Sequence, residues 1–345
     1  MVPKNLRRMP GKRKHMRKPK ILVVGSLVMD QIATTRVFPR QGQTVLGERF
    51  DKAPGGKGSN QAVQAARLGA EVTMVGKLGR DANGEEMLNA SRASGVHTEY
   101  IMLDDKTASG CCVIILEVQP DGSTQNRILV IPGANMAITP QDVEFLREEV
   151  ANYDLVMLQL EIPMQINELV AGFAHAKGVP VMLNPAPSAP LSDELLRCLT
   201  FISPNEHEAE DLTGIHIRHE GKNINWQDVE LAAKSLRDRG VKNVLITLGS
   251  AGAALCNENG IFHSPCAAGI TAVDPTAAGD SFLGAFCAGY CCGWDWETLL
   301  RFANHTAAIT VSGMGAMPSL PKLAQVKSLL TERIGCCPDT SALEK

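Results

Sequence analysis

Five continuous apolar runs, separated by segments of helical periodicity, constrain the fold of this chain more than any other feature. Runs of this kind are typical of parallel strands buried on both faces of a sheet. The runs cover residues 21–24, 72–75, 155–158, 179–183 and 244–248, and helical patterns cover 85–93, 140–150 and 228–239. The alternation predicts an α/β fold with a doubly wound, mostly parallel sheet. Ligands of such sheets bind beyond the carboxyl ends of the strands.

Two segments interrupt this alternation. Residues 31–54 and 107–131 have strand-like patterns and turn signals, but neither contains a helix of its own. The patterns predict hairpin-like strands that stand outside the alternation. The predicted organisation is a basic arm over residues 1–19, one α/β domain over 20–335 that includes these strands, and a C-terminal tail over 336–345.

Charge and cysteine content narrow the class of protein. Residues 1–20 contain nine Lys or Arg and no acid; the whole chain carries −3, so the remaining residues carry −12. The arm should be disordered, and a nuclear signal, a nucleic-acid arm or a transit segment are alternatives to an inert tail. The acidic body argues against a nucleic-acid substrate.

No apolar run reaches the length of a membrane span. The chain has ten cysteines and no C-x-x-C motif, which indicates reduced thiols in a cytoplasmic protein.

Residues 272–286 combine a turn of small residues with the start of an apolar helix. The turn Ala277-Ala278-Gly279 would leave the first amides of that helix unpaired at the positive end of its dipole, where anions bind. Asp280 follows in the same turn, in a position suited to a base beside a phosphate. The alternative is an acidic residue in the first turn of an ordinary helix.

A second glycine-rich segment, Pro54-Gly-Gly-Lys-Gly-Ser-Asn60, precedes another apolar helix. Its glycines allow the backbone to approach a ligand closely, and Ser59 is the predicted N-cap of the helix. No Gly-Lys pair of the chain is followed by Ser or Thr, so this is not a Walker loop. A purely structural turn is the alternative for the glycine pair alone.

Together the two segments resemble the signature segments of the ribokinase (PfkB) family of carbohydrate kinases, and the likeness extends over about residues 20–330. Further motifs occur in the family's order: Gly25-Ser-Leu-Val-Met-Asp30, Gln159-Leu-Glu161, Asn184-Pro-Ala-Pro187, Pro204-Asn-Glu-His-Glu208 and Thr247-Leu-Gly-Ser-Ala-Gly252. The resemblance implies a β-sheet lid over a sugar site, and a homodimer formed through the lids.

The resemblance also implies roles for individual residues. Asp280 would be the catalytic base, and the amides of Ala277, Ala278 and Gly279 would hold the transferred phosphoryl group. The residues expected to bind the sugar are Asp30, Gly56, Lys57, Gly58, Asn60, Glu161 and Asp280. Those expected at the nucleotide are Asn205, Glu208, Thr247, Leu248, Gly249, Ser250, Ala251, Gly252, Gly279, Asp280 and Asn304.

Two metal ions are implied in the same way. Mg²⁺ with ATP would lie near Asn205 and Glu208, for which the start of an acidic helix is the alternative interpretation. K⁺ would be bound by Asp274, Thr276, Thr310, Gly313, Gly315 and Ser319, in part through backbone carbonyls.

The expected reaction is the ATP-dependent phosphorylation of D-ribose at O5. Val28 stands where bacterial members of the family have asparagine, so the sugar specificity stays open. The alternatives are a kinase for another pentose, a nucleoside or a sugar acid, and a non-catalytic sugar- or nucleotide-binding protein. No membrane partner is expected, and the basic arm leaves a nuclear location open.

Overall fold

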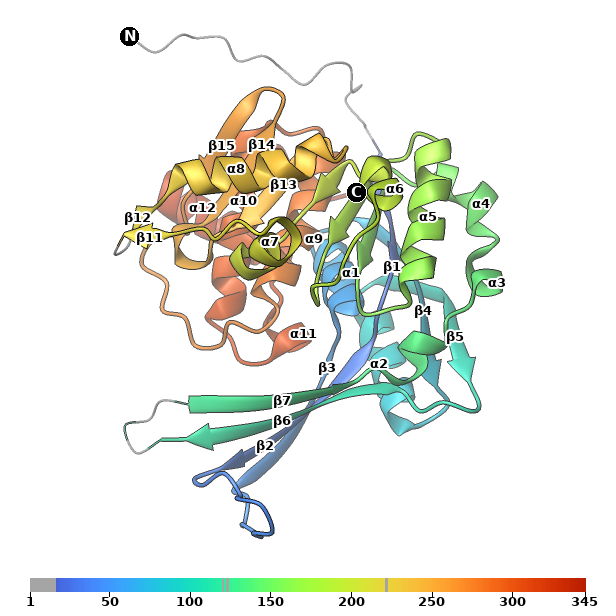
Figure 1. Cartoon of the computed structure of the whole chain (residues 1–345), viewed down its shortest axis with the longest axis vertical. Helices are drawn as coiled ribbons and strands as arrows, with labels where there is room; N and C mark the ends of the chain where they lie inside the picture. The colour runs from blue at the N-terminus through green and yellow to red at the C-terminus, as the bar shows by residue number, and fades with distance from the viewer. Residues whose placement is uncertain (1–16, 120, 122–123, 221–222) are drawn as a thin grey trace.

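The main sheet is mostly parallel and lies between two layers of helices, as the alternating pattern predicts (Figure 1). This computed structural model describes residues 17–119, 121, 124–220 and 223–345, so most of the basic arm, with its predicted disorder, lies outside the described residues. The strand order is β15-β14-β13-β10-β9-β8-β1-β4-β5; in the described part of the chain its antiparallel pairs are β13 with β14 and β14 with β15. The strands are β1 (Lys20–Val24), β4 (Glu71–Gly79), β5 (Val96–Asp104), β8 (Leu155–Gln159), β9 (Val181–Asn184), β10 (Phe201–Ile202), β13 (Asn243–Thr247), β14 (Ala253–Asn257) and β15 (Gly260–Ser264).

Alternate residues of each central strand contribute to two separate hydrophobic cores. In β1, Ile21 and Val23 join one core, and Leu22 and Val24 join the other. The first core includes α1 (Lys57–Arg67), α2 (Ala82–Ala93), α9 (Ala278–Cys291), α10 (Trp296–Val311), α11 (Ala316–Ser319) and α12 (Leu323–Ile334). The second includes α3 (Pro140–Val143), α4 (Leu146–Glu149), α5 (Met164–Ala176), α6 (Asp193–Cys198), α7 (Glu206–Thr213) and α8 (Trp226–Asp238). Burial on both faces explains why these strands are continuously apolar.

Two predicted helix boundaries were wrong. Residues 140–150 form α3, α4 and the 3-10 turn η2 (Val150–Asn152) instead of one helix. The break places Phe145 against the ring of Tyr100, with 4.5 Å between centroids, while Val143 and Leu146 stay buried. The second error is the N-cap of α1, which is Gly56 with φ 93°. Glycine readily adopts this conformation, so the helix begins at Lys57, and the Ser59 hydroxyl donates to the Gly55 carbonyl instead.

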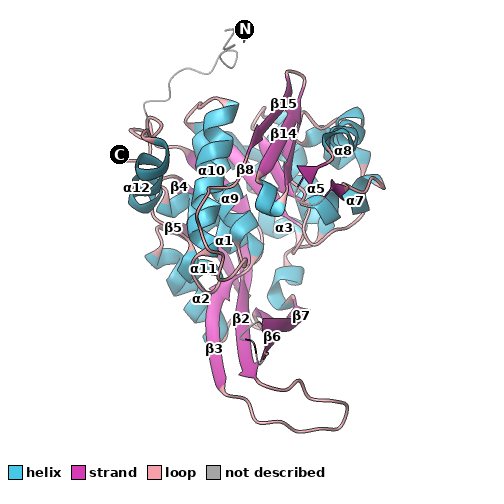
Figure 2. Cartoon of the chain, turned by 90° about the vertical axis from the view of Figure 1, so that its left-hand side faces the viewer, coloured by secondary structure: helices cyan, strands magenta, loops and turns pink. Residues whose placement is uncertain are grey.

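The two irregular segments form a four-stranded sheet that projects from the body (Figures 1 and 2). Its order is β3-β2-β6-β7, with β2 (Val28–Thr35), β3 (Arg49–Gly55), β6 (Gly110–Val118) and β7 (Thr124–Ile131). Strand β2 begins earlier than predicted, so Asp30 lies within the lid and not in a loop after β1. The remaining short elements are β11 (His219–Glu220), β12 (Asn223–Ile224), η1 (Gly133–Ala137) and η3 (Gly249–Ala251). No helix of the described residues has both the length and the apolar character needed to cross a membrane.

The last residues of the chain pack back onto the body. Leu343 is buried in the first core, and a side chain at Gly69 would meet its backbone. The indole of Trp294 donates to the carbonyl of Asp339 at 3.0 Å. The segment is therefore part of the packed fold.

We expect Leu343→Ala to lower the free energy of unfolding by about 2–5 kcal/mol, because it leaves a cavity in the core. Leu46→Ala is the matched control: that leucine is 92% exposed, so its truncation should change stability by no more than about 0.5 kcal/mol. Urea denaturation of both variants measures the difference. Equal stability of the two would show that the C-terminal segment does not pack as described.

Candidate active site

The two glycine-containing segments meet at the carboxyl ends of the parallel strands. Asp280, in the first turn of α9, accepts hydrogen bonds from two side chains of α1: Asn60 at Oδ2 and Gln61 at Oδ1, each at 3.0 Å. A cavity of about 220 Å³ opens beside them. Its lining residues are Lys57, Asn184, Ser203, Asn205, Glu208, Thr247, Pro275, Ala277, Ala278, Gly279, Asp280 and Leu283.

A larger cavity, of about 510 Å³, lies elsewhere and contains none of the residues predicted for the site. Arg67, Ser94, Met317 and Lys322 are among its lining residues. Its size alone gives it no chemistry, whereas the smaller cavity brings together an amine, two carboxylates and the N-terminus of a helix. The smaller cavity is therefore the candidate active site.

Strained backbone precedes the helix that carries Asp280. Ala277 is the N-cap of α9 and, among the described residues other than glycine, the one with a positive φ, 60°. For alanine this left-handed conformation costs about 1–2 kcal/mol, and such strain concentrates at functional sites. The amide of Ala278 donates to the Pro275 carbonyl at 3.2 Å, so it is less available to an anion than predicted. Gly279 and Asp280 follow at the positive end of the helix.

Asp280 is almost fully buried beside the cationic side chain of Lys57. Burial raises the pKa of Asp280, while the charge of Lys57 and the hydrogen bonds from Asn60 and Gln61 oppose that rise. Burial in turn favours a lower pKa for Lys57, but the carboxylates of Asp280, Glu161 and Glu208 outweigh it, and the pKa of Lys57 lies above its ordinary value. Lys57 therefore stays charged and keeps several carboxylates close together.

The start of α1 is bound to Glu161, just beyond the end of β8. The backbone amide of Lys57 donates to Glu161 Oε2 at 2.9 Å, and the hydroxyl of Ser26 donates to the same oxygen. Ser26 Oγ also accepts the amide of Gly58 at 3.2 Å. A side chain at Gly58 would lie 2.5 Å from the Ser26 amide, so this close approach requires glycine. The contacts hold Gly56, Lys57 and Gly58 in one conformation.

Asp30 brings a further carboxylate to the same place from the lid. Burial, followed by the charges of Glu161, Asp274 and Asp280, raises the pKa of Asp30 to about 7. Asn60 contributes a side-chain oxygen, Oδ1, that is buried without a hydrogen-bond partner among the described residues. Buried polar atoms normally have partners, so Asn60 and the carboxylates form a set of acceptors suited to a ligand with several hydroxyl groups.

Asn205 and Glu208 form a capping box at the N-terminus of α7 and also line the cavity. The Asn205 amide donates to Glu208 Oε2 at 2.9 Å, and the Glu208 amide donates to Asn205 Oδ1 at 2.8 Å. Both interpretations of this motif, helix start and ligand site, are thus compatible. Burial raises the pKa of Glu208, against the opposing effects of the Asn205 amide and Lys57.

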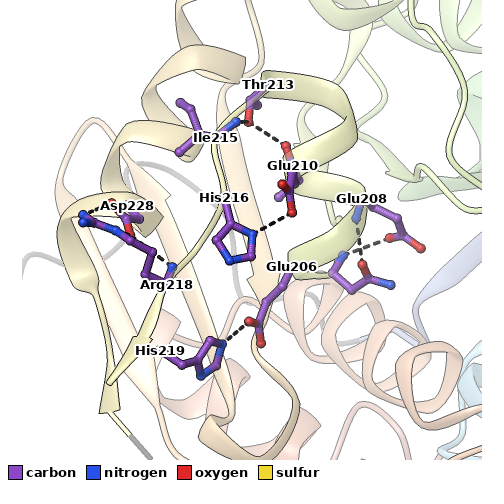
Figure 3. A network of polar contacts seen from close by, with 11 residues as sticks. Glu206, Glu208, Glu210, Thr213, Ile215, His216, Arg218, His219 and Asp228 are labelled. Atoms are coloured by element: carbon purple, nitrogen blue, oxygen red, sulfur yellow. Dashed lines mark hydrogen bonds and ion pairs between the residues drawn. The ribbon is translucent and has the colours of Figure 1, made fainter. Parts of the chain in front are cut away.

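Helix α7 is tied to the segment that follows it. Figure 3 shows His216 and His219 directed back toward the helix, and Arg218 directed toward α8. The pairs are Glu206 with His219, Glu210 with His216 and Asp228 with Arg218. These contacts fix the helix that positions Asn205 and Glu208 at the cavity.

The predicted nucleotide segment lies just beyond β13, next to the cavity. Thr247 lines the cavity, and the turn that follows is closed by the Leu248 amide, which donates to the Gly252 carbonyl at 2.8 Å. Gly249 and Gly252 have positive φ angles of 51° and 96°, with Ser250 and Ala251 between them. Asn304 lies in α10, where its amide donates to the carbonyls of Ser264 and Pro265. Asn304 therefore holds the end of β15 and the residue that follows it in place.

The residues predicted to bind K⁺ lie in the loop before α9 and around the end of α10, and the two regions are joined by the Asp274 amide, which donates to the Val311 carbonyl at 3.1 Å. Asp274 Oδ1 accepts the amide and hydroxyl of Thr276, and Asp274 Oδ2 accepts the amide of Gly315 at 2.9 Å. The carbonyl of Thr310 accepts the amide of Gly313 at 3.0 Å, and a side chain at Gly313 would lie 3.0 Å from Ser319. The oxygen atoms of carboxylates, hydroxyls and carbonyls are the ligands that hard cations prefer.

Several polar residues of the site received no role from the sequence, among them the three amides that surround Asp280. Gln61 contacts Asp280, Gln159 contacts Gln61, and Asn184 lines the cavity. Gln159 and Asn184 stand in motifs of the resemblance, at the ends of β8 and β9. Gln61 follows Asn60 in a helix that was expected to be buried. A glutamine in such a helix was the signal that the sequence offered, and the structure buries it fully.

Comparisons with known proteins agree with this geometry. The family model described as "pfkB family carbohydrate kinase" matches residues 18–323. A ribokinase of Bacillus subtilis is 38% identical over 311 residues, which cover 90% of this chain and 99% of that protein. A deoxyribokinase of Salmonella typhi is 33% identical, with 90% and 98% coverage.

A solved structure extends the comparison. The Arabidopsis thaliana ribokinase complexed with ribose and ATP superposes with a TM-score of 0.81 and 34% identity, covering 91% of this chain and 99% of that one. Residues 18–323, which the family model matches, include every residue of the candidate active site. This chain belongs to the pfkB family of carbohydrate kinases, and it is an ATP-dependent carbohydrate kinase.

Proposed function

We propose that the protein phosphorylates D-ribose at O5, with Asp280 as the general base. The observation that carries the proposal is the placement of one buried carboxylate. Asp280 lies in the first turn of α9 and contacts Asn60, which belongs to the set of hydroxyl acceptors. The ribokinases among the relatives support ribose, and the structure titled with ribose and ATP supports the pair of substrates. Asp30, Glu161, Asn60 and the backbone of residues 56–58 would hold the sugar.

The proposed reaction is an in-line displacement. The sugar 5-hydroxyl attacks the γ-phosphorus of ATP, its proton passes to a carboxylate oxygen of Asp280, and ADP leaves. The amide of Gly279 would stabilise the charge on the transferred phosphoryl group, because preorganised donors act where charge develops. The ammonium group of Lys57 would add a positive charge beside the transferred phosphoryl group. The lid, whose strand β2 carries Asp30, would keep out water that competes as acceptor.

Two metal sites belong to this proposal. Glu208 and Asn205 would hold Mg²⁺ through water, since part of each side chain is already engaged in the capping box. When bound, Mg²⁺ neutralises phosphate charge. Asp274, Thr276, Thr310, Gly313, Gly315 and Ser319 would hold K⁺ beneath the Asp280 turn. The charge of that cation would order the turn without reaching the substrate.

The lid also supports a homodimer. All eight residues of β7 are exposed, including the consecutive apolar side chains of Ile128, Leu129, Val130 and Ile131, which are 40–64% exposed. Successive residues of a strand face opposite sides of the sheet, so both faces of this edge strand expose apolar side chains, and exposed apolar surface of this kind marks an interaction site. We infer that the lid of a second copy covers it.

Deoxyribose is the second candidate substrate. Val28 is buried at the start of β2 and offers no polar group to the sugar. A site with fewer polar groups discriminates less against a sugar that lacks a hydroxyl, and a deoxyribokinase is among the relatives.

The experiment is ADP release with Mg-ATP against ribose, 2-deoxyribose, fructose and adenosine, each with K⁺ and with the K⁺ replaced by tetramethylammonium. We expect ribose to have the highest kcat/KM and K⁺ to raise it. A higher kcat/KM for any other member of the panel would contradict the substrate assignment. Equal rates in both salts would contradict the K⁺ site.

A further inference from the structure

A chain of buried amide side chains reaches Asp280 from α1 and the ends of β8 and β9. Gln159, at the end of β8, donates through Nε2 to Oε1 of Gln61 at 2.8 Å. Gln61 donates in turn through Nε2 to Asp280 Oδ1 at 3.0 Å and to Asn184 Oδ1 at 3.3 Å. Asn184 is itself oriented, because its amide donates to the Ser203 carbonyl at 3.1 Å. Gln61 and Gln159 are fully buried.

The contacts of Gln61 determine which way its amide points. An amide has a donor end and an acceptor end, and the choice between them follows from the hydrogen-bond network. In the reverse orientation the Gln61 oxygen would face two other oxygens, those of Asp280 and Asn184. Its nitrogen would face the donor nitrogen of Gln159. The Gln61 oxygen would then be unsatisfied in a buried site, so Asn184, which the Ser203 carbonyl orients, holds Gln61 as a donor to Asp280. Gln159 supplies the N–H that the Gln61 oxygen accepts, while its own Oε1 has no hydrogen-bond partner among the described residues.

A donor at this position has a consequence for the carboxylate. Each oxygen of Asp280 receives one side-chain N–H, from Gln61 at Oδ1 and from Asn60 at Oδ2. A carboxylate oxygen can accept more than one hydrogen bond, so an accepting position is left on the carboxylate for a substrate hydroxyl. The two donors fix the plane of the group, and hydrogen bonds to the ionised form favour that form.

We propose that Gln61 is a positioning residue for the kinase reaction: held as a donor by Asn184 and bonded through its oxygen to Gln159, it orients Asp280 and keeps its carboxylate ionised. Gln159 acts one step further away, through Gln61. This inference rests on the proposed function, since it assumes that Asp280 is the base. No hydrogen bond among the described residues joins the side chains of Gln61, Gln159 or Asn184 to Glu208 or Asp274.

The alternative is that the buried glutamines only satisfy one another and maintain the fold. Gln64, one turn further along α1, provides the matched control. It is equally buried and also bonded at both ends: its Nε2 donates to the Pro321 carbonyl, and its Oε1 accepts the Ser281 hydroxyl, each at 3.0 Å. It makes no contact with the Asp280 carboxylate. Replacing each glutamine by methionine keeps length and neutrality and removes only the amide.

The experiment is the pH profile of kcat in Gln61→Met, Gln159→Met and Gln64→Met. The acid limb of the profile reports ionisation of the base in the bound complex. Loss of the Gln61 donor destabilises the ionised carboxylate, so we expect the limb to move to higher pH, by about one unit. Gln159→Met should move it in the same direction by less. Gln64→Met should leave the limb in place even if it lowers the melting temperature.

The outcomes separate this inference from the function on which it rests. An unmoved acid limb in both Gln61→Met and Gln159→Met, or an equal movement in Gln64→Met, overturns the positioning role while the proposed reaction stands. If Gln61→Met does not fold, Gln159→Met and its control still decide the question. Wild-type turnover in Asp280→Asn would instead overturn the base, and the positioning role with it.

Discussion

Asp280→Asn lowers kcat by about 10²–10⁴-fold if this carboxylate takes the proton of the attacking hydroxyl. Asparagine keeps the size of the side chain and can still hydrogen-bond within the cavity, but it cannot accept a proton. The dissociation constants of sugar and ATP should therefore change little. Initial rates and calorimetric titration of both substrates measure the two quantities separately.

Asp238→Asn is the control for this experiment. Asp238 is an exposed carboxylate at the end of α8, paired with Lys234 on the surface. Its replacement should leave kcat at the wild-type level. A kcat for Asp280→Asn within about threefold of the wild type would mean that another group serves as the base.

The second large effect concerns Asp30 and the affinity for sugar. Asp30→Asn removes a charged acceptor from the hydroxyl-binding set, and a hydrogen bond to a charged group contributes about 1.5–3 kcal/mol. We therefore expect the KM for ribose to rise by roughly 10–150-fold with kcat much less affected. Asp51→Asn, in the neighbouring lid strand β3 and paired with Arg49, should leave KM unchanged.

The pH dependence gives an independent test of the same residue. With the pKa of Asp30 at about 7, the carboxyl group is ionised above that pH and protonated below it. If the ionised form binds sugar, kcat/KM for ribose falls about tenfold for each unit of pH below 7. This fall in kcat/KM below pH 7 should be absent from the pH profile of Asp30→Asn. Its persistence there would assign the titration to another group.

Much of the fold followed from hydrophobic pattern. The central strands were recognisable because both of their faces are buried, as the two cores on either side of β1 show. The lid was recognisable from its strand period. The helix break at Phe145 and the packing of Leu343 against the body depend on contacts distant in sequence, with Tyr100 in one case and the Gly69 turn in the other. Local pattern does not contain that information.

The site divides in the same way. Asp280, Lys57 and Glu161 stand out because charged residues at the ends of buried strands or in glycine-rich turns have few structural explanations. The role of Gln61 depends on which end of its amide faces Asp280, and Asn184 decides that from another element. The Ala278 amide is engaged by Pro275, which no spacing rule predicts.

The most direct test of the proposed reaction is the position of the phosphate in the product. Ribose labelled with ¹³C at C5 is incubated with the full-length protein, Mg-ATP and K⁺, and the product is examined by ¹³C and ³¹P NMR. The proposed reaction predicts that the labelled carbon becomes coupled to phosphorus as ADP accumulates. A sugar phosphate whose labelled carbon shows no coupling to phosphorus, or ADP formed without a sugar phosphate, would contradict it.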